Sequence, residues 1–581
     1  MYRNIEKYSK KSGFGKFMYR LIFRSTKTSK SSQKKIDKNA IGRKSFAPYE
    51  GKIIRKINIV TLDPFGYSAN NTTDVPEKGF ERFGNSIHLK TKNWTIRNIL
   101  LFKKNEPLDS LVAKESERLV RRQRYIRSVV IEPVAIEGSS DSVDVSVRAL
   151  DSWSLIPNGA VSSSKMNVEL TERNFFGLGH EFENEYGKRF DQGHQAYSAR
   201  YRINNIQNTF INATALYDND LDNNTIRSVT VERPFFSTYT RWAAGATYRY
   251  QFYADSLPNL ANQFALKSFR IQTKDFWAGH SFKIFSGKTE EVRTIKLVTT
   301  FRYADVKYMD KVEFEYDPEQ FLSSEKLYLS SIGISSQKFQ QDKYLFNFGI
   351  IEDVPYGYLF SVTGGYQNKN YKNRAYFGGR FAFGNYFRFG YLGTNFEYGG
   401  FINNGKTEES AFRIEAYYFT NMLRFGNWKL RQFIKPSVVV GSNRNYNIKD
   451  RLNLDDANGI PGFSSNEKLF GTKKLLVSFQ TQSYAPGNFH GFHFSPFFNF
   501  TIGSLGDETN KTFDTKFYSS FGVGVLINND YLVFSSFQLS FSFYPTMPEN
   551  GSNIIKTNSF KNDDFNLPDY QIGQPIIVPY R

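Results

Sequence analysis

The chain has 581 residues, more than one ordinary soluble core usually organises, and it contains no cysteine, which excludes disulfides, thiolate metal sites and thiol catalysis. Aromatic residues make up 17% of it, yet the mean hydropathy is -0.49 and no run of 18 apolar residues occurs, which excludes a transmembrane helix. Such an excess of aromatic residues suits the two interfacial belts of a membrane-spanning β-barrel, the closed structure that lipid allows without helices.

The formal net charge of +20 is concentrated at the start of the chain, where residues 1–56 contain 17 Lys and Arg but 3 Asp and Glu. A basic run can bind nucleic acid or an anionic membrane surface, but no nucleic-acid motif lies nearby. We therefore predict a basic leader, residues 1–50, that forms a solvated tail or a short amphipathic helix. Arg20 interrupts its short apolar stretch, which is therefore no secretory signal. If the protein is exported, we expect the printed sequence to lack its signal peptide.

Residues 51–150 carry the only helical signals of the chain. Asp109 follows Pro107 and can cap a helix in which Leu111 and Leu119 share one side. The later stretch DSVDVSVRAL alternates apolar and polar residues, as a half-buried strand does. We predict a domain of order β-α-α-β-β, with elements at residues 53–62, 94–102, 109–125, 127–138 and 141–150.

Residues 151–581 alternate almost throughout, as in the stretch FQLSFSFYP that begins at Phe537. One face is apolar and aromatic, and the other is polar, small or charged. Charged residues between the aromatic ones are expected to face a wet lumen, which a soluble sandwich does not have. Examples are Arg249, Arg302, Arg413 and Glu415. The predicted fold class is therefore mainly β, a transmembrane antiparallel barrel of 16 to 20 strands, with sixteen favoured.

The stretch GFINNGKTEES, Gly400 to Ser410, fits the phosphate-loop pattern of nucleotide-binding proteins at every fixed position. A phosphate loop needs a helix after it, because the helix N-terminus binds the phosphates. Here Phe412 and Ile414 alternate with Arg413, so a strand follows instead. We predict a polar hairpin turn and no nucleotide site.

A β-α-α-β-β module placed directly before a barrel resembles a POTRA domain, and residues 51–581 are similar to the superfamily of outer-membrane assembly factors and two-partner-secretion transporters. Three stretches carry the likeness: NSIHLKTKNWTIRNILLFKKNEPLDSLVAKESERLVRRQRYIRSVVI in the module, LTERNFFGLGHEFENEYG in the first barrel hairpin, and ANGIPGFSSNEKLFGTKKLLVSFQTQSYAP in an inward-folded sixth extracellular loop, about residues 443–472, and in the strand that follows it. The resemblance implies a 16-stranded barrel, residues 151–581, in the outer membrane of a Gram-negative bacterium. It also implies a periplasmic POTRA-like domain and a role in inserting proteins into that membrane or moving polypeptide across it.

In this superfamily the sixth loop carries an aliphatic-Arg-Gly-aromatic tetrad, whose Arg reaches the acid of a Phe-x-Asp-x-Gly motif on the barrel wall. The matching tetrad here is Ile460, Pro461, Gly462 and Phe463, with Pro in the place of Arg. The matching wall residues are Asn499, Thr501 and Gly503, with Thr501, or Asn499 in a shifted register, in the acidic slot. Because both charges are lost together, neither is stranded, and the loop is still expected to fold inward. An ordinary Pro-Gly turn is the alternative.

The resemblance implies that the partners are unfolded client polypeptide and outer-membrane lipid, with other envelope assembly subunits as further partners. We predict that a client adds as a strand to the edge of the DSVDVSVRAL strand, or packs on the helix before it. The candidate client-binding residues are Leu111, Leu119, Tyr125, Val143, Val145 and Val147.

The last residues allow two interpretations. The stretch QIGQPIIV, Gln571 to Val578, matches the loose pattern that assembly machineries recognise on client barrels, but Pro575 and Pro579 favour an extended segment. The preceding residues 560–567 alternate weakly and fit either a poor closing strand or a loop.

No catalytic pattern emerges from the sequence. The six histidines lack metal-ligand spacing, no Gly-x-Ser-x-Gly motif occurs, and the pairs Glu290–Glu291 and Glu408–Glu409 lie in turns that we expect to be solvated. We therefore expect no enzymatic activity, no cofactor or metal, no nucleotide and no nucleic acid. Two other functions stay open: an accessory barrel whose loop is a static plug, and a porin-like channel.

Overall fold

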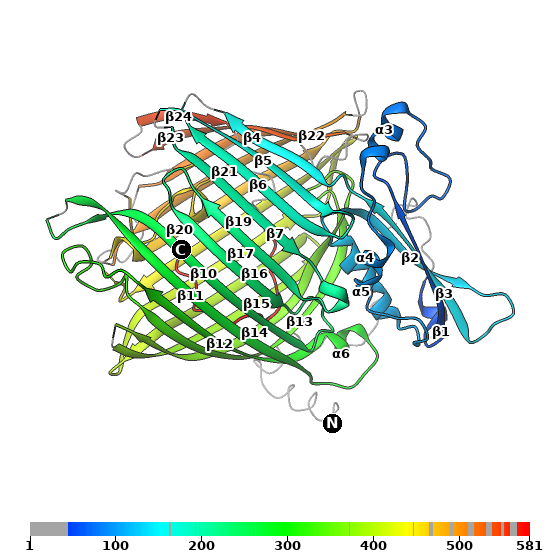
Figure 1. The fold of residues 1–581 in the computed structure, drawn as a ribbon, viewed down its shortest axis with the longest axis horizontal. Coiled ribbons are helices and arrows are strands. Elements are labelled where there is room, and N and C mark those ends of the chain that lie inside the picture. Colours follow the sequence, from blue (N-terminus) through cyan, green and yellow to red (C-terminus); the bar gives the residue numbers. More distant parts are fainter. Residues whose placement is uncertain are drawn as a thin grey trace. The chain divides into compact units, whose positions relative to one another are not determined.

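A computed structural model describes residues 45–161, 164–191, 193–261, 263–370, 372–445, 447–463, 469–487, 492–508, 516–529, 537–547, 551–557 and 566–581 (Figure 1). Most of the predicted basic leader, residues 1–50, lies outside this set. No helix within the described ranges is long and apolar enough to cross a membrane.

The N-terminal module has a three-stranded sheet and three helices, and a single turn of 3-10 helix, Ala47–Tyr49, precedes it. Its elements are β1 (Ile53–Leu62), α3 (Gly79–Ile87), α4 (Asn93–Arg97), α5 (Ser110–Arg121), β2 (Ile126–Ala135) and β3 (Ser142–Asp151). The predicted strands and the helix after Asp109 are present, and the Asp109 carboxylate accepts from the main-chain N–H groups of Leu111 and Val112 at 3.0 and 3.1 Å. Sequence reasoning missed α3, because two glycines in nine residues lower its helix propensity.

The module sheet has the order β1-β3-β2, with β1 parallel and β2 antiparallel to β3. Alternate residues of β3 point into the core of the module, where Val143, Val145 and Val147 are fully buried. Leu119 and Val120 of α5 belong to the same buried cluster. This apolar layer between helix and sheet is what fixes the module as a unit.

A closed antiparallel barrel follows the module. Its strands are β4 (Leu155–Val161), β5 (Lys165–Phe175), β6 (His180–Arg189), β7 (Gln195–Ile203), β8 (Asn212–Asn219), β9 (Thr225–Arg233), β10 (Trp242–Pro258), β11 (Phe264–Lys283), β12 (Ile295–Tyr308), β13 (Glu325–Lys343), β14 (Ile351–Lys369), β15 (Lys372–Phe387), β16 (Gly390–Asn403), β17 (Lys406–Thr420), β18 (Leu423–Phe425), β19 (Trp428–Ser442), β20 (Lys473–Tyr484), β21 (Phe492–Gly506), β22 (Tyr518–Asn529), β23 (Phe537–Met547) and β24 (Gly551–Thr557).

The strand count departs from the favoured value. β17 and β18 pair one after the other with β19, so they act as one interrupted strand, and the described strands β4 to β24 then make a barrel of twenty. The favoured sixteen is too low, and the upper end of the expected range is correct. Alternation marks which face a residue takes, but it does not separate neighbouring strands that are joined by short turns.

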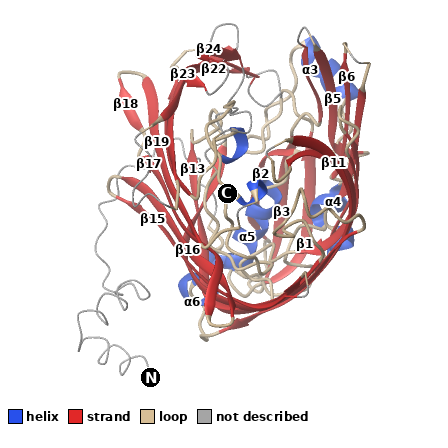
Figure 2. Ribbon diagram, turned by 90° about the vertical axis from the view of Figure 1, so that its left-hand side faces the viewer, coloured by secondary structure: helices blue, strands red, loops and turns tan. Residues whose placement is uncertain are grey.

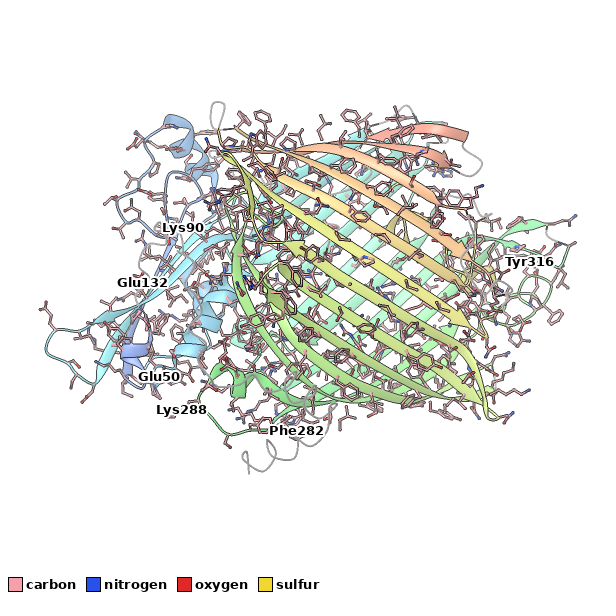
Figure 3. The ribbon with its side chains drawn as sticks, turned by 180° about the vertical axis from the view of Figure 1, so that it is seen from behind. Glu50, Lys90, Glu132, Phe282, Lys288 and Tyr316 are labelled. Atoms are coloured by element: carbon pink, nitrogen blue, oxygen red, sulfur yellow. The ribbon has the colours of Figure 1, made fainter. Side chains whose placement is uncertain are left out.

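The wall alternates as the sequence predicts. On β21, Phe498 is 41% exposed on the outside, whereas Asn499 and Thr501 are buried on the lumenal side. Figure 3 shows the outer wall with its side chains. The fold class, a mainly β chain with a closed barrel, is therefore confirmed.

The two longest connections between barrel strands lie at the same end of the barrel. At the end near the module the connections range from residues 388–389 to residues 284–294, and short turns such as residues 404–405 occur at the far end too. At the other end lie the long connections 309–324 and 443–472. Figure 3 places Tyr316 of the first long connection at the opposite end of the barrel from Glu132 of the module.

Candidate functional site

The phosphate-loop match is a β-hairpin. β16 ends at Asn403 and β17 begins at Lys406, and these two residues form the last registered pair. Asn404 and Gly405 make the turn with φ angles of 48° and 77°, which suit a two-residue hairpin of the mirror-image type. Because a strand follows the loop, no helix N-terminus faces the Gly-Lys-Thr sequence.

The module is fixed to the barrel along α5. Arg121 of α5 forms an ion pair of 2.8 Å with Asp353 at the start of β14, and both side chains are largely buried. The guanidinium of Arg118 lies 3.9 Å from the centre of the Phe339 ring on β13. Asp109 accepts a 2.6 Å hydrogen bond from Arg293 in α6 (Glu290–Thr294), the turn between β11 and β12.

A second attachment lies on a distant part of the wall. The carbonyl of Gly177, in the turn between β5 and β6, accepts from the Lys92 main-chain N–H and the Thr95 hydroxyl, both at 3.0 Å. β6 and β14 are eight places apart in the closed order of strands, so the module bridges the mouth of the barrel. In the view along the barrel, α5 and β2 lie within the ring of strands (Figure 2).

The predicted client edge on β3 is wrong. β3 is the central strand and pairs with β1 on one side and β2 on the other, so its main chain offers no free edge. The fully buried valines of β3 and the buried Leu119 and Tyr125 belong to the module core, and only Leu111 is half exposed. Alternation identified β3 as a strand but carried no information on its place in the sheet.

The edge strands of the sheet are β1 and β2. In the described structure β2 pairs with β3 alone, and Pro133 lies within it, as prolines in sheets do on edge strands. Val134 near its end is 38% exposed. The start of β1 is covered instead, because Ile54 exchanges main-chain hydrogen bonds with residues 105 and 106.

The described residues of the predicted sixth loop, residues 443–472, pack into the barrel. In this twenty-stranded barrel the loop is the eighth connection at its end, so the predicted ordinal is wrong, and we keep sixth loop only as its name. Ile460 is 0% and Phe463 2% exposed, and Gly462 takes the positive φ of 71° that the turn between them requires. The Gly462 N–H donates to the Asp456 carboxylate at 2.8 Å. The loop residues share one buried cluster with the lumenal wall, formed by Val439, Leu452, Leu454, Ile460, Phe463, Leu505, Tyr518, Tyr544 and Met547.

The wall holds this loop by its main chain. Tyr544 on β23 donates to the carbonyl of Pro461 at 2.6 Å, and Lys556 on β24 donates to the carbonyl of Gly462 at 2.8 Å. The donor thus lies on the wall and the acceptor on the loop. Sequence reasoning missed both donors, since they lie 83 and 94 residues from their acceptors and no local pattern links them.

The polar wall residues Asn499 and Thr501 hydrogen-bond to each other, and neither bonds to the tetrad of residues 460–463 in the described structure. Thr501 donates to Asn499 and to Ser478, each at 3.2 Å. Gly503 lies under the loop, because a Cβ there would be 2.9 Å from the Leu454 side chain. Of these wall positions, Gly503 is therefore the one at which the described structure places the loop directly on the wall.

Residues 566–581, here called the lumenal segment, form no strand and lie against the inner wall. Tyr570 is fully buried, and its hydroxyl is 2.7 Å from that of Tyr391 on β16, which also bonds the Pro355 carbonyl. Farther along, the Tyr580 hydroxyl donates to the carbonyl of Thr472, in the sixth loop, at 3.2 Å. Of the two interpretations of QIGQPIIV, the extended segment is the one observed. The candidate closing strand, residues 560–567, lies mostly outside the described residues.

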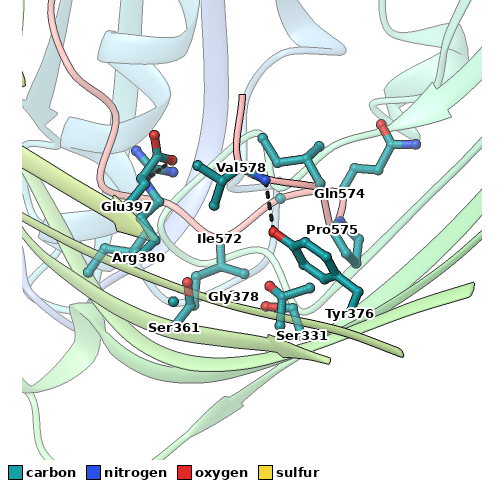
Figure 4. A pocket seen from close by; sticks show the side chains of 15 residues that line it. Ser331, Ser361, Tyr376, Gly378, Arg380, Glu397, Ile572, Gln574, Pro575 and Val578 are labelled. Atoms are coloured by element: carbon teal, nitrogen blue, oxygen red, sulfur yellow. Dashed lines mark hydrogen bonds and ion pairs between the residues drawn. The ribbon is translucent and has the colours of Figure 1, made fainter. Parts of the chain in front are cut away.

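The wall bonds the main chain of the lumenal segment at four points. Two carbonyls accept hydrogen bonds and two N–H groups donate them, with distances between 2.8 and 3.2 Å. The pairs, segment residue first, are Pro575 with Arg302, Asp569 with Arg380, Tyr570 with Gln337, and Val578 with Tyr376. Figure 4 shows the hydrogen bond that the Val578 N–H donates to the Tyr376 hydroxyl.

We predicted that the carboxylates of Glu408 and Glu409 are solvated, but the structure shows that a buried arginine binds both of them. Both form ion pairs with Arg374, at 3.1 and 2.8 Å, and the Arg374 side chain is 6% exposed. Positive φ at Glu409 (47°) and a bulge in β17, where residues 409 and 410 lie opposite Gly400 alone, let two consecutive residues reach one guanidinium, which a strict alternation does not predict.

The described histidines belong to no cluster that could hold a metal ion. Among the described residues, no cluster of three or more His, Asp or Glu side chains could hold a metal ion. His493 stacks on Phe348 with ring centres 4.2 Å apart, and His490 lies outside the described set. His88 and Asp151 pair at 3.1 Å where the module joins the barrel.

No protein-family model matches the chain, and no curated protein matches it in sequence. Its structural neighbours include BamA and CdiB barrels. BamA from Haemophilus ducreyi lacking POTRA domains 1–3 is 11% identical with a TM-score of 0.37, covering 87% of this chain and 85% of that one. CdiB from Escherichia coli is 11% identical with a TM-score of 0.41, covering 87% and 75%. The alcaligin outer-membrane receptor FauA from Bordetella pertussis is 11% identical with a TM-score of 0.26, covering 76% and 69%. Likeness this low leaves function to be inferred from the chain's own geometry.

Proposed function

We propose that this chain is an outer-membrane barrel that assists the insertion of proteins into that membrane or the passage of polypeptide across it. The observation that carries the proposal is the module, a small sheet with an edge strand, fixed across one mouth of a closed barrel at two distant points. A polypeptide that reaches this mouth meets the module first.

The membrane setting and orientation are part of the proposal. Aromatic residues on the outer wall suit lipid, and bacterial outer-membrane barrels have short periplasmic turns and longer extracellular loops. The two longest connections, 309–324 and 443–472, lie at the end away from the module, although two-residue turns such as 404–405 lie there as well. The two long connections support our proposal of a periplasmic module and of a sixth loop at the cell surface of a Gram-negative bacterium.

The client is expected to add to the edge of β2. An extended polypeptide can extend a sheet by bonding the main chain of an edge strand, which β3 cannot offer. β2 can offer it except at Ile131, whose N–H donates to Glu117 of α5 at 3.4 Å. Glu132 on β2 is registered with Ser146 on β3, which is registered with Asn58 on β1, so the three form one row across the sheet.

This row supplies a matched crosslinking test. A photoreactive residue at position 132 should capture polypeptide in cells, and the same residue at position 58, on the opposite edge, should capture much less. Equal capture at both positions, or none at position 132, would count against the β2 edge.

Depletion of the protein separates insertion from export. General loss of outer-membrane proteins from the proteome is expected of an insertion factor, and loss of one exported protein is expected of a dedicated transporter. An unchanged outer-membrane and secreted proteome after depletion would refute both.

One alternative has an observation in its favour. Two segments, the sixth loop and the lumenal segment, occupy the barrel interior, as a statically plugged accessory barrel would require. The same observation disfavours an open porin. Planar-bilayer recordings test this point, since a porin-like channel would show large steady conductance in the unmodified protein.

A further inference from the structure

The inner wall of the barrel recognises the lumenal segment largely through its main chain. Four side chains from three strands, β12, β13 and β15, bond carbonyl and N–H groups of the segment. Every non-proline residue carries such groups, so these contacts do not depend on the sequence that is bound. Arg302 also pairs with Asp275 at 2.7 Å, and Gln574 donates to the same carboxylate at 3.0 Å, so the wall donors are held in position.

The wall is also hollowed beneath the segment. At five lumenal glycines on β13, β15, β16 and β19, an added Cβ would meet a side chain of the segment at 3.0 Å or less. The pairs are Gly333 with Ile572, Gly384 and Gly393 with Tyr570, Gly399 with Val578, and Gly441 with Tyr580. Side-chain recognition is concentrated at Tyr570, whose hydroxyl fits between these glycines and Tyr391.

We infer that this track is a binding site for an extended polypeptide, and that the lumenal segment is its displaceable occupant. The inference deepens the proposed function and rests on it for the identity of the natural ligand, an incoming client segment in extended conformation. The ligand class follows from the bonds themselves, which engage four main-chain groups along the track and the side chains of Tyr570 and Gln574.

The packing of the segment on the wall is incomplete, as a displaceable occupant requires. A cavity of about 80 Å³ lies between residues 572–578 and wall residues that include Ser361, Tyr376, Arg380 and Glu397 (Figure 4). Because the segment is tethered, its effective concentration at the track is on the order of millimolar, so modest intrinsic affinity suffices to keep the track filled.

Peptide binding to the purified full-length barrel and to a variant lacking residues 566–581 tests the inference. The probe is a fluorescein-labelled synthetic peptide of residues 567–581, LPDYQIGQPIIVPYR, followed by anisotropy in detergent. Saturable binding is expected to the shortened protein, with binding to the full-length protein weaker by about tenfold or more, because the tethered segment competes. A peptide with Tyr570→Ala is expected to bind about tenfold or more weakly, as buried tyrosine anchors do.

Two glycines of β15 give a matched pair of wall variants. In Gly384→Ala the new methyl group would overlap the Tyr570 hydroxyl, whereas in Gly379→Ala, on the opposite face of the strand, the nearest atom is the Ser361 carbonyl oxygen at 3.9 Å. In the shortened protein, Gly384→Ala should weaken peptide binding and Gly379→Ala should leave it unchanged.

If the shortened protein does not fold, full-length variants decide the question. The chain has no cysteine, so Ile572→Cys, at a position that is 7% exposed, provides a single site for maleimide labelling. Labelling should be slow in this variant and faster when Gly384→Ala is added, but not when Gly379→Ala is added.

The inference is overturned if the peptide does not bind the shortened protein, or if it binds the shortened and the full-length protein equally. It is also overturned if Ile572→Cys is labelled at the same rate alone, with Gly384→Ala and with Gly379→Ala. These measurements use purified protein and do not involve client handling in cells. If these measurements show that the lumenal track does not bind peptide, the proposed function is still tested separately by the depletion experiment.

Discussion

Lys474 on β20 donates to the main-chain carbonyls of Asn453 and Asn458 in the sixth loop. Two further hydrogen bonds from the barrel wall end on the carbonyls of Pro461 and Gly462. A substitution in the loop cannot remove a main-chain acceptor, so at the residue scale the wall donors Tyr544 and Lys556 control this contact. Pro461 restricts the loop backbone and Gly462 supplies the left-handed conformation, and both therefore present their carbonyls in fixed directions.

Tyr544→Phe should loosen the loop. The ring stays, but the bond to the Pro461 carbonyl is lost, which should lower the stability of the loop contact by about 1 kcal/mol. Faster hydrogen exchange at residues 452–463 is the expected result. Tyr418→Phe is the matched control, since the half-exposed Tyr418 also donates to a main-chain carbonyl, that of Phe389, which lies at the module end of the barrel and away from the loop. Equal exchange in both variants would contradict the role given to Tyr544.

The hairpin of β16 and β17 gives a second residue-scale prediction. Gly405 takes a φ of 77°, so Gly405→Ala should destabilise the turn by roughly 1 kcal/mol. Lys406→Ala should have little effect, because Lys406 has no phosphate to bind here. Thermal unfolding followed by the gel shift of boiled against unboiled barrel compares the two variants. If the protein bound nucleotide and Lys406→Ala abolished that binding, our conclusion that this turn is not a nucleotide site would be wrong.

At the scale of elements, the sequence predicts what is local and misses what is distant. Alternation placed Asn499 and Thr501 on the lumenal side of β21 and identified β3 as a strand, since side-chain direction repeats every two residues. It did not predict that β3 lies at the centre of its sheet, because strand order depends on partners far along the chain. For the same reason it did not predict the contacts of Tyr544 and Lys556.

The module sheet should show acid sensitivity at one ion pair. Arg55 on β1 bonds Asp144 on β3, with 2.9 Å from Nε to Oδ1, and this hydrogen bond holds the pKa of Asp144 below its ordinary value. A carboxyl group with a lowered pKa adds stability above its unfolded pKa of about 3.9, and this contribution is lost as the pH falls through the folded pKa.

The difference in denaturant midpoint between wild type and Arg55→Ala should accordingly be constant above about pH 5 and shrink below about pH 4. Tryptophan fluorescence in the full chain provides the measurement. Lys104→Ala, at an exposed lysine of the same module, is the control and should show no such change with pH. A difference that grows on acidification would contradict the pairing.

At the scale of the whole molecule, the module and the barrel are joined by contacts of unequal burial. Arg121 and Asp353 are 7% and 14% exposed, whereas Arg124, which pairs with Glu181 on β6 at 3.5 Å, is 64% exposed. Arg121→Ala leaves buried carboxylates without their partner and should weaken docking by roughly 2 to 4 kcal/mol. Arg124→Ala, at a solvated pair, should cost less than about 1 kcal/mol.

Hydrogen exchange of α5 in the full chain measures docking of the module. Exchange should rise clearly in Arg121→Ala and little in Arg124→Ala. If the two variants behave alike, the α5 contact does not hold the module across the mouth. The sequence could predict the module and the barrel separately, but not this junction, since Arg121 and Asp353 are 232 residues apart.

The position of the lumenal segment constrains the order in which the molecule can be built. The module is synthesised first and bridges the mouth, whereas residues 566–581 follow the last described strand, β24, and lie inside the barrel. If the strands closed before the segment was in place, the segment would have to thread into a finished pore whose mouth the module bridges. A simpler route lets the strands close around the segment, which would then act as an internal template that aligns β12 to β16 before the ring is sealed.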